Sequence, residues 1–288
     1  MSTNHTLQYS VLMSVYKRET AINLQMAMDS IWNQTKQTND FVLVCDGPIS
    51  DELNDVIHKA EQTHPNTLNV IRLKNNTGLG NALNTGIKHC KNDLIARMDS
   101  DDISRPYRCE KQLEQFQKKE DLCICSGIVE EFTNDPNIVY SLRIPPETHK
   151  DIKEFMKTRN PFNHPCVMYR KNAVEASGGY MDFYLLEDYF LWIRIIKKGF
   201  IGYNIQEPLL WMRGGKDLYK RRGGWKYARS QVNLLKYMKK VGIITMKEFL
   251  IGFMIRMTSC LSPSFIRQLF YKIFLRERVF LNRNATSS

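Results

Sequence analysis

The sequence lacks long hydrophobic runs, a leader-like N-terminus and any CxxC pair of cysteines. Because a membrane-spanning helix needs about 18 or more consecutive apolar residues, a transmembrane chain is not expected. The opening MSTNHTLQYS has neither a basic segment nor an apolar core, so a secretory signal is not indicated. Seven scattered cysteines, an odd number, and six histidines that do not cluster near them indicate neither a disulfide framework nor a zinc site. We expect a reduced, cytoplasmic protein.

Two common glycine-rich phosphate-binding motifs are also missing. A dinucleotide-binding fold would carry GxGxxG after its first strand, but that position reads SVYKRE, without glycine. The later stretch NTGLGNALNTG contains GxG without the remaining spacing, and no P-loop occurs. A nucleotide, if one is bound, must therefore be held by other residues.

Length and charge indicate the broad organisation. The 288 residues, 43% of them hydrophobic, suffice for one large α/β domain with an appendage, or for two small domains. The net charge of +11 is concentrated after residue 212, because the first 212 residues together carry a net charge of −3. A basic end on a mildly acidic body indicates contact with an anion. A merely solvated basic face is the alternative.

Apolar, β-rich runs and helical stretches alternate along the first part of the chain. Strands are expected at residues 9–15, 40–46, 68–73 and 94–98, and helices between them at 21–34, 50–63 and 80–89, with Ser50 as an N-cap. This alternation predicts an α/β fold with a mostly parallel sheet flanked by helices. Ligands of such sheets bind beyond the carboxyl ends of the strands, where Asp46 and the stretch ARMDSDD (residues 96–102) both fall.

Three aspartates are crowded into ARMDSDD. Carboxylates held close together repel one another unless a cation lies between them. Asp99 and Asp101, on an extended turn, offer oxygen ligands for Mg²⁺ or Mn²⁺, which prefer carboxylate, water and phosphate oxygens. Asp102 precedes a helix expected at residues 105–119, and we expect it to cap that helix.

Glu187 and Asp188 begin a helix expected at residues 187–198. The positive end of the helix dipole favours ionised carboxylates there. A structural role and a role as general base are both compatible with this position. Four residues recur at helical spacing and predict one buried stripe, namely Tyr189, Trp192, Ile193 and Ile196.

A lone histidine, His164, lies in the loop NPFNHP (residues 160–165), just before an expected strand. Prolines on both sides of the loop restrict its backbone. The histidine can contact a substrate, and a satisfied structural histidine is the equal alternative.

The last part of the chain changes character. Residues 213–229 (RGGKDLYKRRGGWKYAR) are basic and contain two Gly-Gly pairs. This stretch can close over the diphosphate of a donor, and it can equally contact the diphosphate of a lipid-linked acceptor. Beyond Pro263 an amphipathic helix is expected, whose apolar side consists of Phe265, Ile266, Leu269, Phe270, Ile273 and Phe274. A basic helix of this kind lies in a bilayer interface. A C-terminal helical pair packed on the domain is the alternative.

In this order, the motifs SVYKRE, VCDG, NNTGLGNALNTGI, ARMDSDDISRPYR, FNHPCVMYRK and LEDYFLWIRI resemble glycosyltransferase family 2 over roughly residues 9–215. The resemblance implies a GT-A fold and inverting transfer of a hexose from a nucleotide-diphosphate donor, usually UDP, with Mg²⁺ or Mn²⁺. Within the family the chain is similar to bacterial enzymes of O-antigen, capsule and exopolysaccharide synthesis. By that analogy the donor sugar is galactose or glucose, and the acceptor is of the GlcNAc-diphospho-undecaprenol type.

The resemblance also implies a division of the chain. We expect a glycosyltransferase domain over residues 1–230, with a nucleotide-binding half at about 1–105 and an acceptor half at about 106–230. Residues 231–288 are expected to form a basic, amphipathic helical extension. Such an extension implies a peripheral protein on the cytoplasmic face of the inner membrane.

The same resemblance assigns expected roles to single residues. The nucleotide-binding residues are expected to be Tyr16, Glu19, Asp46, Asn76, Arg97 and Asp99. Asp99 and Asp101 are the expected metal ligands, with Asp101 in the more direct contact, and Asp188 is the expected base. The acceptor side is expected to include His164, Glu187, Trp192, Arg221 and Arg222.

One departure from the family pattern concerns an arginine. Many relatives have Ala-Arg-Asn where this chain has Ala82, Leu83 and Asn84. Arg97 or the pair at residues 221–222 is expected to replace that arginine.

Two other classes of protein remain open from the residues alone. A sugar nucleotidylyltransferase also needs a metal and a similar sheet, but it usually carries a glycine-rich, basic loop after the first strand. A non-catalytic membrane- or nucleic-acid-binding protein would use the basic end, but that function leaves the aspartates unexplained. We expect no nucleic-acid partner.

Overall fold

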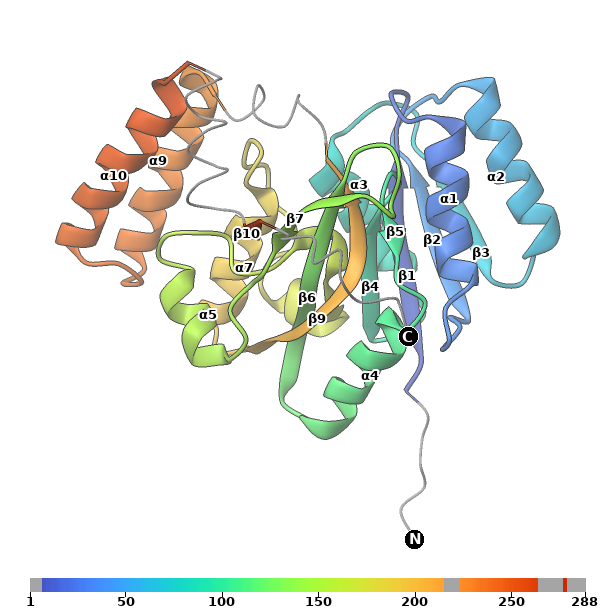
Figure 1. Ribbon diagram of the computed structural model, residues 1–288, viewed down its shortest axis with the longest axis horizontal. Coiled ribbons are helices and arrows are strands. Elements are labelled where there is room, and N and C mark those ends of the chain that lie inside the picture. The colour runs from blue at the N-terminus through green and yellow to red at the C-terminus, as the bar shows by residue number, and fades with distance from the viewer. Residues whose placement is uncertain (1–6, 215–222, 264–276, 279–288) are drawn as a thin grey trace, which may run out of the picture.

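The computed structural model describes residues 7–214, 223–263 and 277–278. Its strands (Figure 1) are β1 (Tyr9–Val15), β2 (Asp40–Cys45), β3 (Leu68–Arg72), β4 (Leu94–Asp99), β5 (Ile103–Ser104), β6 (Leu122–Phe132), β7 (Val139–Arg143), β8 (Met168–Arg170), β9 (Ile201–Arg213) and β10 (Glu277–Arg278). Its helices are α1 (Ala21–Trp32), α2 (Asp51–Thr63), α3 (Leu79–His89), α4 (Arg108–Lys118), α5 (His149–Phe155), α6 (Lys171–Ala176), α7 (Glu187–Lys197), α9 (Trp225–Lys240) and α10 (Met246–Leu261), with a 3-10 turn at His164–Cys166.

One mixed sheet forms the centre of the molecule. Its strand order is β10-β7-β6-β8-β4-β1-β2-β3, with β9 beside β6 and β5 paired with β9. The four strands β4, β1, β2 and β3 run parallel, which confirms the arrangement expected from the alternating pattern. The other half adds antiparallel pairs, because β8 runs against both β4 and β6, and β7 runs against β6.

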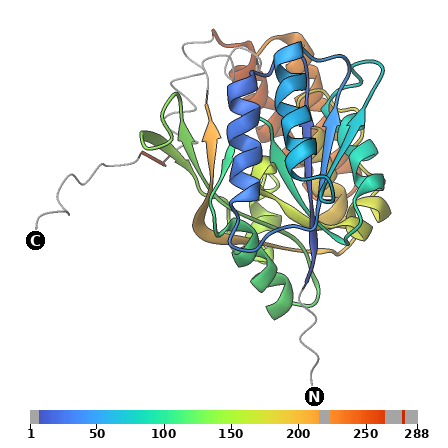
Figure 2. The same ribbon diagram turned by 90° about the vertical axis from the view of Figure 1, so that its right-hand side faces the viewer.

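Helices cover both faces of this sheet. Along β1, Val11 and Met13 face the core layer that contains α1, α2 and α4, whereas Leu12 faces the layer that contains α3 and α7. Figure 2 shows α1 and α2 side by side over one face. Since β1 and β2 are buried on both faces, their sequences are continuous apolar runs rather than alternating ones.

The crossover helices begin close to their expected positions. Thr20 accepts a hydrogen bond from the Asn23 backbone N–H at the start of α1, and Ser50 accepts one from Leu53 N–H at the start of α2. These side chains satisfy backbone donors that the first turn of a helix leaves unpaired. The cap at Ser50 confirms the role predicted for this residue. The two cap residues mark the ends of the loops that follow β1 and β2.

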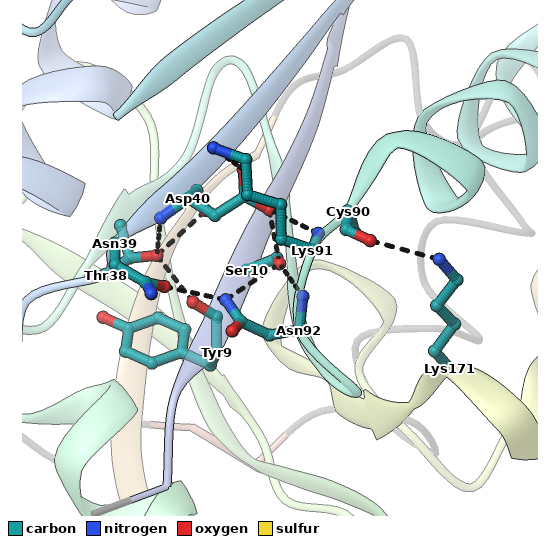
Figure 3. Close-up of polar contacts among 9 residues, drawn as sticks. All are labelled: Tyr9, Ser10, Thr38, Asn39, Asp40, Cys90, Lys91, Asn92 and Lys171. Carbon is teal, nitrogen blue, oxygen red and sulfur yellow. Dashed lines mark hydrogen bonds and ion pairs between the residues drawn. The ribbon is translucent and has the colours of Figure 1, made fainter. Parts of the chain in front are cut away.

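A buried acid lies at the opposite end of β2 from the expected site (Figure 3). Asp40 Oδ2 accepts hydrogen bonds from Ser10 Oγ at 2.6 Å and from the Lys91 backbone N–H at 2.8 Å. Asn92 in turn donates to Ser10 Oγ through its backbone N–H, at 3.1 Å. This network ties β1, β2 and the start of β4 together, so Asp40 has a structural role that Asp46, at the other end of the strand, does not share.

The described C-terminal part is a helical pair. α9 and α10 pack against each other and against α7, where the rings of Tyr237 and Phe190 meet edge-on at 4.8 Å. α9 begins at Trp225, so the domain boundary expected at residue 230 falls inside this helix. The amphipathic helix expected beyond Pro263 lies outside the described residues. None of the helices within the described ranges is long and apolar enough to cross a membrane.

Candidate active site

The carboxyl ends of three parallel strands meet at one edge of the sheet. Val15 of β1 lies opposite Cys45 of β2, and Ser14 of β1 lies opposite Asp99 of β4. The segments that follow these strands therefore leave the sheet together. This is the edge at which the sequence placed Asp46 and the aspartate cluster, and at which parallel α/β sheets bind their ligands.

The aspartate cluster is arranged as a potential metal site. One carboxylate oxygen from each of Asp99, Asp101 and Asp102 can be chosen so that all three lie within 4.8 Å of one another. Asp102 Oδ2 is buried and has no hydrogen-bond partner among the described residues. Three hard oxygen ligands, one of them an unpaired buried atom, fit a divalent cation such as Mg²⁺ or Mn²⁺.

Arg97 holds one of these acids. Its guanidinium pairs with both carboxylate oxygens of Asp99, one of them at 2.8 Å. The Arg97 side chain is only 1% exposed, whereas that of Asp99 is 35% exposed. Arg97 therefore acts on Asp99 from inside the protein, and this structure does not present its guanidinium directly to a ligand. The charge of Asp99 is already partly balanced.

Asp101 lacks a comparable partner. Burial and the neighbouring carboxylates of Asp99 and Glu19 raise the pKa of Asp101 from 3.8 to about 7, against a smaller opposing effect of Arg213. A cation placed between the carboxylates would remove this repulsion. A metal in the cluster would therefore stabilise the ionised form of Asp101.

Asp102 does not cap a helix, so that expectation is wrong. The next helix, α4, begins only at Arg108, after the short strand β5, and Tyr107 is its N-cap residue. Asp102 Oδ1 instead accepts a hydrogen bond from the Arg213 backbone N–H at 2.8 Å. Burial, followed by the charges of Asp101 and Asp99, raises the pKa of Asp102 well above its usual value. This acid ties the cluster to the end of β9.

The metal-free protein should lose stability as the pH rises. Because the pKa of Asp101 is about 7 in the folded protein and about 3.9 in an unfolded chain, only the folded state keeps this proton between those values. Its contribution is complete below about pH 4 and is lost as the pH rises through 7. Thermal melts in EDTA should therefore show a falling Tm between pH 5 and 8, and Mn²⁺ should restore the Tm at pH 8.

Asp101→Asn is the matched control for these melts. Its Tm should fall less steeply with pH and should respond less to Mn²⁺, although Glu187, whose pKa is also raised to about 7, still contributes. A wild-type Tm that rises from pH 5 to 8 in EDTA, or that ignores Mn²⁺, would contradict the electrostatic description of the cluster.

Asp46 shapes the loop that follows β3. Its carboxylate accepts hydrogen bonds from Asn76 Nδ2 at 3.0 Å, from the Thr77 N–H at 2.7 Å and from the Gly78 N–H at 3.0 Å. Gly47, next to it, has φ +87°, and a Cβ there would lie 2.6 Å from Asn76 N. Asp46 and Asn76 therefore lie together as expected, but their side chains bind each other. Direct contact of either with a nucleoside remains a prediction.

The loop after β1 contacts the aspartate cluster. Glu19 Oε2 accepts a hydrogen bond from Ser100 Oγ at 3.2 Å, while Glu19 Oε1 accepts one from Asn23 Nδ2 at 3.0 Å. Tyr16, in the same loop, is 40% exposed. The structure thus brings Glu19 to the cluster and leaves the Tyr16 ring accessible for stacking. Ser100 was not singled out from the sequence, since only the two aspartates beside it offer carboxylate oxygens to a metal.

The two acids of the second motif start α7, as expected. Leu185, immediately before this turn, has φ +58°, and it is the only non-glycine residue with positive φ in the described part of the chain. This conformation is disfavoured for a branched side chain. Leu186 N–H closes the turn on Phe183 O at 2.8 Å, which directs Glu187 and Asp188 from the first turn of the helix.

Two N–H groups hold the Asp188 carboxylate. Asn160 Nδ2 donates to Oδ2 at 2.7 Å, and the Tyr189 backbone N–H donates to Oδ1 at 2.7 Å. Such donors, together with the helix N-terminus, favour the ionised form of a carboxylate. Asn160 was missed in the sequence because a loop asparagine 28 positions away carries no periodic signal, although it belongs to the NPFNHP motif.

Glu187 differs from its neighbour. Burial, and then the charge of Asp188, raise the pKa of Glu187 to about 7, while the Arg97 cation opposes this rise. Arg97 therefore lies within electrostatic reach of both acidic groups, the aspartate cluster and the start of α7. The structure gives the two adjacent acids different environments, which is a common property of catalytic carboxylates.

His164 lies in an aromatic cluster with Tyr180 and Trp192. Its Nε2 is 2.9 Å from Tyr180 Oη, and burial and the Arg97 cation lower the pKa of His164 well below its ordinary range. Trp192 meets the His164 ring edge-on at 5.9 Å and is 0% exposed. The expected contact of Trp192 with an acceptor is incompatible with that burial, whereas the buried stripe predicted on α7 is confirmed.

At the position where many relatives have an arginine, this chain has a residue of the hydrophobic core. Leu83 is fully buried in the layer beneath α3. The next residue, Asn84, clamps the Tyr180 backbone by donating to its carbonyl at 2.6 Å and accepting from its N–H at 2.8 Å. Of the expected replacements, Arg97 is bound to Asp99, and residues 221–222 (Arg221 and Arg222) lie outside the described residues.

Comparison with known proteins agrees with this geometry. The model of Glycosyl transferase family 2 matches residues 10–178. The chain is 36% identical over 267 residues to the amylovoran biosynthesis glycosyltransferase AmsE of Erwinia amylovora, covering 92% of this chain and 98% of that one. It is also 36% identical over 276 residues to the UDP-Gal:alpha-D-GlcNAc-diphosphoundecaprenol beta-1,3-galactosyltransferase of Escherichia coli, covering 95% and 98%.

Solved structures support the fold. The structure of S. aureus TarS 1-349 in complex with UDP-GlcNAc superimposes with a TM-score of 0.65 at 15% identity, covering 93% of this chain and 77% of that one. At such low identity the likeness concerns the fold alone, which is the expected GT-A type. With the family match and the close relatives, it follows that the chain belongs to glycosyl transferase family 2 and is a glycosyltransferase.

Proposed function

We propose that this enzyme transfers galactose or glucose from its UDP-sugar to a lipid-linked acceptor of the GlcNAc-diphospho-undecaprenol type, in the synthesis of a bacterial surface polysaccharide. The name of the Escherichia coli relative, a UDP-Gal:alpha-D-GlcNAc-diphosphoundecaprenol beta-1,3-galactosyltransferase, supports this donor and acceptor. The observation in the molecule that carries the proposal is a pair of acidic groups that both lie within electrostatic reach of Arg97, one suited to a metal and one suited to a base.

The donor side uses the aspartate cluster. Asp101, with Asp99, would hold the Mn²⁺ or Mg²⁺ ion that the proposed reaction requires. When bound, the ion stabilises the negative charge of the departing UDP. Arg97 keeps the Asp99 carboxylate in place from below. Tyr16, Glu19 and the loop held by Asp46 would surround the nucleoside.

The acceptor side uses Asp188. We assign to it the removal of the proton from the attacking acceptor hydroxyl, because Asn160 and the helix N-terminus favour its ionised form. Direct attack from the side of this base, opposite the leaving diphosphate, inverts the configuration at the anomeric carbon. Glu187 and His164 would then line the acceptor side.

A nucleotide-sugar donor in water and an acceptor on a lipid can meet only at a membrane surface. We therefore propose a peripheral position on the cytoplasmic face of the inner membrane. The basic residues concentrated after residue 212 support contact with anionic lipid headgroups.

A panel of UDP-sugars with a water-soluble, short-chain GlcNAc-diphospho-lipid tests the function. Release of UDP should require Mn²⁺ or Mg²⁺, stop with EDTA, and be fastest with UDP-galactose or UDP-glucose. Asp188→Asn serves as the inactive control. Equal rates in EDTA would remove the metal from the proposal, and transfer only from a different nucleotide sugar would replace the donor.

A further inference from the structure

One helix of the C-terminal pair has an uncovered apolar face. Eight residues of α10 are exposed, and six of them are large and hydrophobic. These six form the outer α10 face: Met246, Leu250, Ile251, Met254, Ile255 and Leu261, with exposed fractions between 44% and 64%. In Figure 1 this helix forms the outer side of the molecule, on the far side of the sheet from α1 and α2.

The opposite side of α10 is already occupied. Phe249, Phe253 and Met257 pack against the core layer formed with α7 and α9, and Arg256 donates to Gln231 of α9 at 2.7 Å. The helix is thus apolar on both sides, although only one side is needed to attach it to the domain. A helix that is apolar all round normally has both sides covered, and so large an exposed patch indicates an interaction site.

The positive charge around the outer α10 face indicates which kind of partner covers it. Residues 225–261 contain seven basic residues and one acid, and the five basic residues of α9 are all exposed. A second copy of the same pair would bring like charges together. The following residues 264–288 add five basic residues and one acid to the same positive charge. An anionic lipid surface offers both apolar depth and opposite charge.

The outer α10 face also continues toward the acceptor side of the site. Gly224 N–H donates to Cys260 O at 3.0 Å, which places Trp225, 73% exposed, at the same end of the pair as Leu261. Next to Trp225, the Lys226 ammonium lies 4.0 Å from the centre of the Tyr184 ring. Tyr184 itself is 39% exposed and belongs to the segment that leads into Asp188.

We propose that the outer α10 face and Trp225 insert into the interfacial region of an anionic membrane and so direct the acceptor side of the site toward the lipid. This inference rests on the proposed lipid-linked acceptor for its purpose, but the membrane contact itself does not depend on catalysis. Trp225 suits the headgroup boundary, where amphipathic aromatic rings are favoured. The exposed lysines of α9 contact the anionic headgroups.

Vesicle co-sedimentation of the full chain tests the contact. Leu250→Gln/Met254→Gln should lower the partition onto phosphatidylglycerol vesicles by about tenfold, since two half-exposed apolar side chains leave the interface. The matched control is Ile138→Gln/Ile144→Gln, which removes two exposed isoleucines on the β6–β7 connection and after β7. It should bind as wild type does. Replacing phosphatidylglycerol with phosphatidylcholine should weaken binding of the wild-type protein.

Activity separates this inference from the proposed function. With the soluble short-chain acceptor, Leu250→Gln/Met254→Gln should match the wild-type kcat, whereas with acceptor carried in vesicles its apparent KM should rise about tenfold. Unchanged vesicle binding by this variant would overturn the inference. A wild-type dimer in sedimentation velocity that the variant loses would assign the face to a second copy. Absence of transfer to the soluble acceptor, with vesicle binding intact, would instead overturn the proposed function alone.

Discussion

Asp101→Ala is expected to abolish sugar transfer and to remove the part of UDP binding that depends on Mn²⁺. The substitution deletes a metal oxygen from an acid that is not held by an arginine as Asp99 is. Losing only an outer-shell partner of a metal costs about 10–100-fold in metal affinity or activity, so loss of a direct ligand should exceed this range. Calorimetric titration of UDP with and without Mn²⁺ measures the effect.

The choice of Asp101 over Asp99 follows from the structure. Removing the Asp99 carboxylate would leave the buried Arg97 guanidinium without its partner, and an unpaired buried charge destabilises the fold. A loss of activity in that variant would therefore mix metal binding with folding. Asp55→Ala, at an exposed acid on α2, is a suitable control and should titrate as wild type does. Metal-dependent UDP affinity that survives in Asp101→Ala would remove Asp101 from the site.

The first four strands could be predicted from the sequence because a strand that is buried on its two faces is a continuous apolar run. β1 to β4 lie within one residue of their expected ends. β9 was not predicted, since Ile201–Arg213 contains polar residues and Pro208, and its pairing with β6 is interrupted by register shifts. Such a strand is defined by its partner and not by its own periodicity.

Some residues of the candidate site could likewise be predicted from the sequence, and others could not. Asp99, Asp101, Glu187 and Asp188 could be named because each pair occupies a short motif at the end of a strand or the start of a helix. Asp102 was assigned wrongly, because its partner is a backbone N–H more than a hundred residues away, on β9. Long-range hydrogen bonds leave no local pattern, and the Asn160 contact to Asp188 is a second case.

Asp188→Asn is expected to lower kcat by about 10²–10⁴-fold, the usual contribution of general base catalysis. The acceptor hydroxyl is a poor nucleophile until its proton is removed as the new bond forms. Asparagine nearly keeps the shape of the side chain, yet it cannot accept that proton. UDP and Mn²⁺ should bind as in the wild type, because Asp99 and Asp101 are untouched. Single-turnover rates with the soluble acceptor measure the chemical step directly.

Glu187→Gln provides the sharpest comparison, because it alters the adjacent acid of the same motif. Glu187 has a pKa raised to about 7 and is partly protonated near neutral pH, so its neutral replacement should cost much less than that of Asp188. A larger loss in Glu187→Gln than in Asp188→Asn would exchange their roles.

The stereochemistry of the product is an independent test of the same base. Attack from the side of Asp188 inverts the anomeric carbon, so an α-linked UDP-sugar should give a β-linked product. An α-linked product in NMR spectra would rule out direct displacement assisted by Asp188.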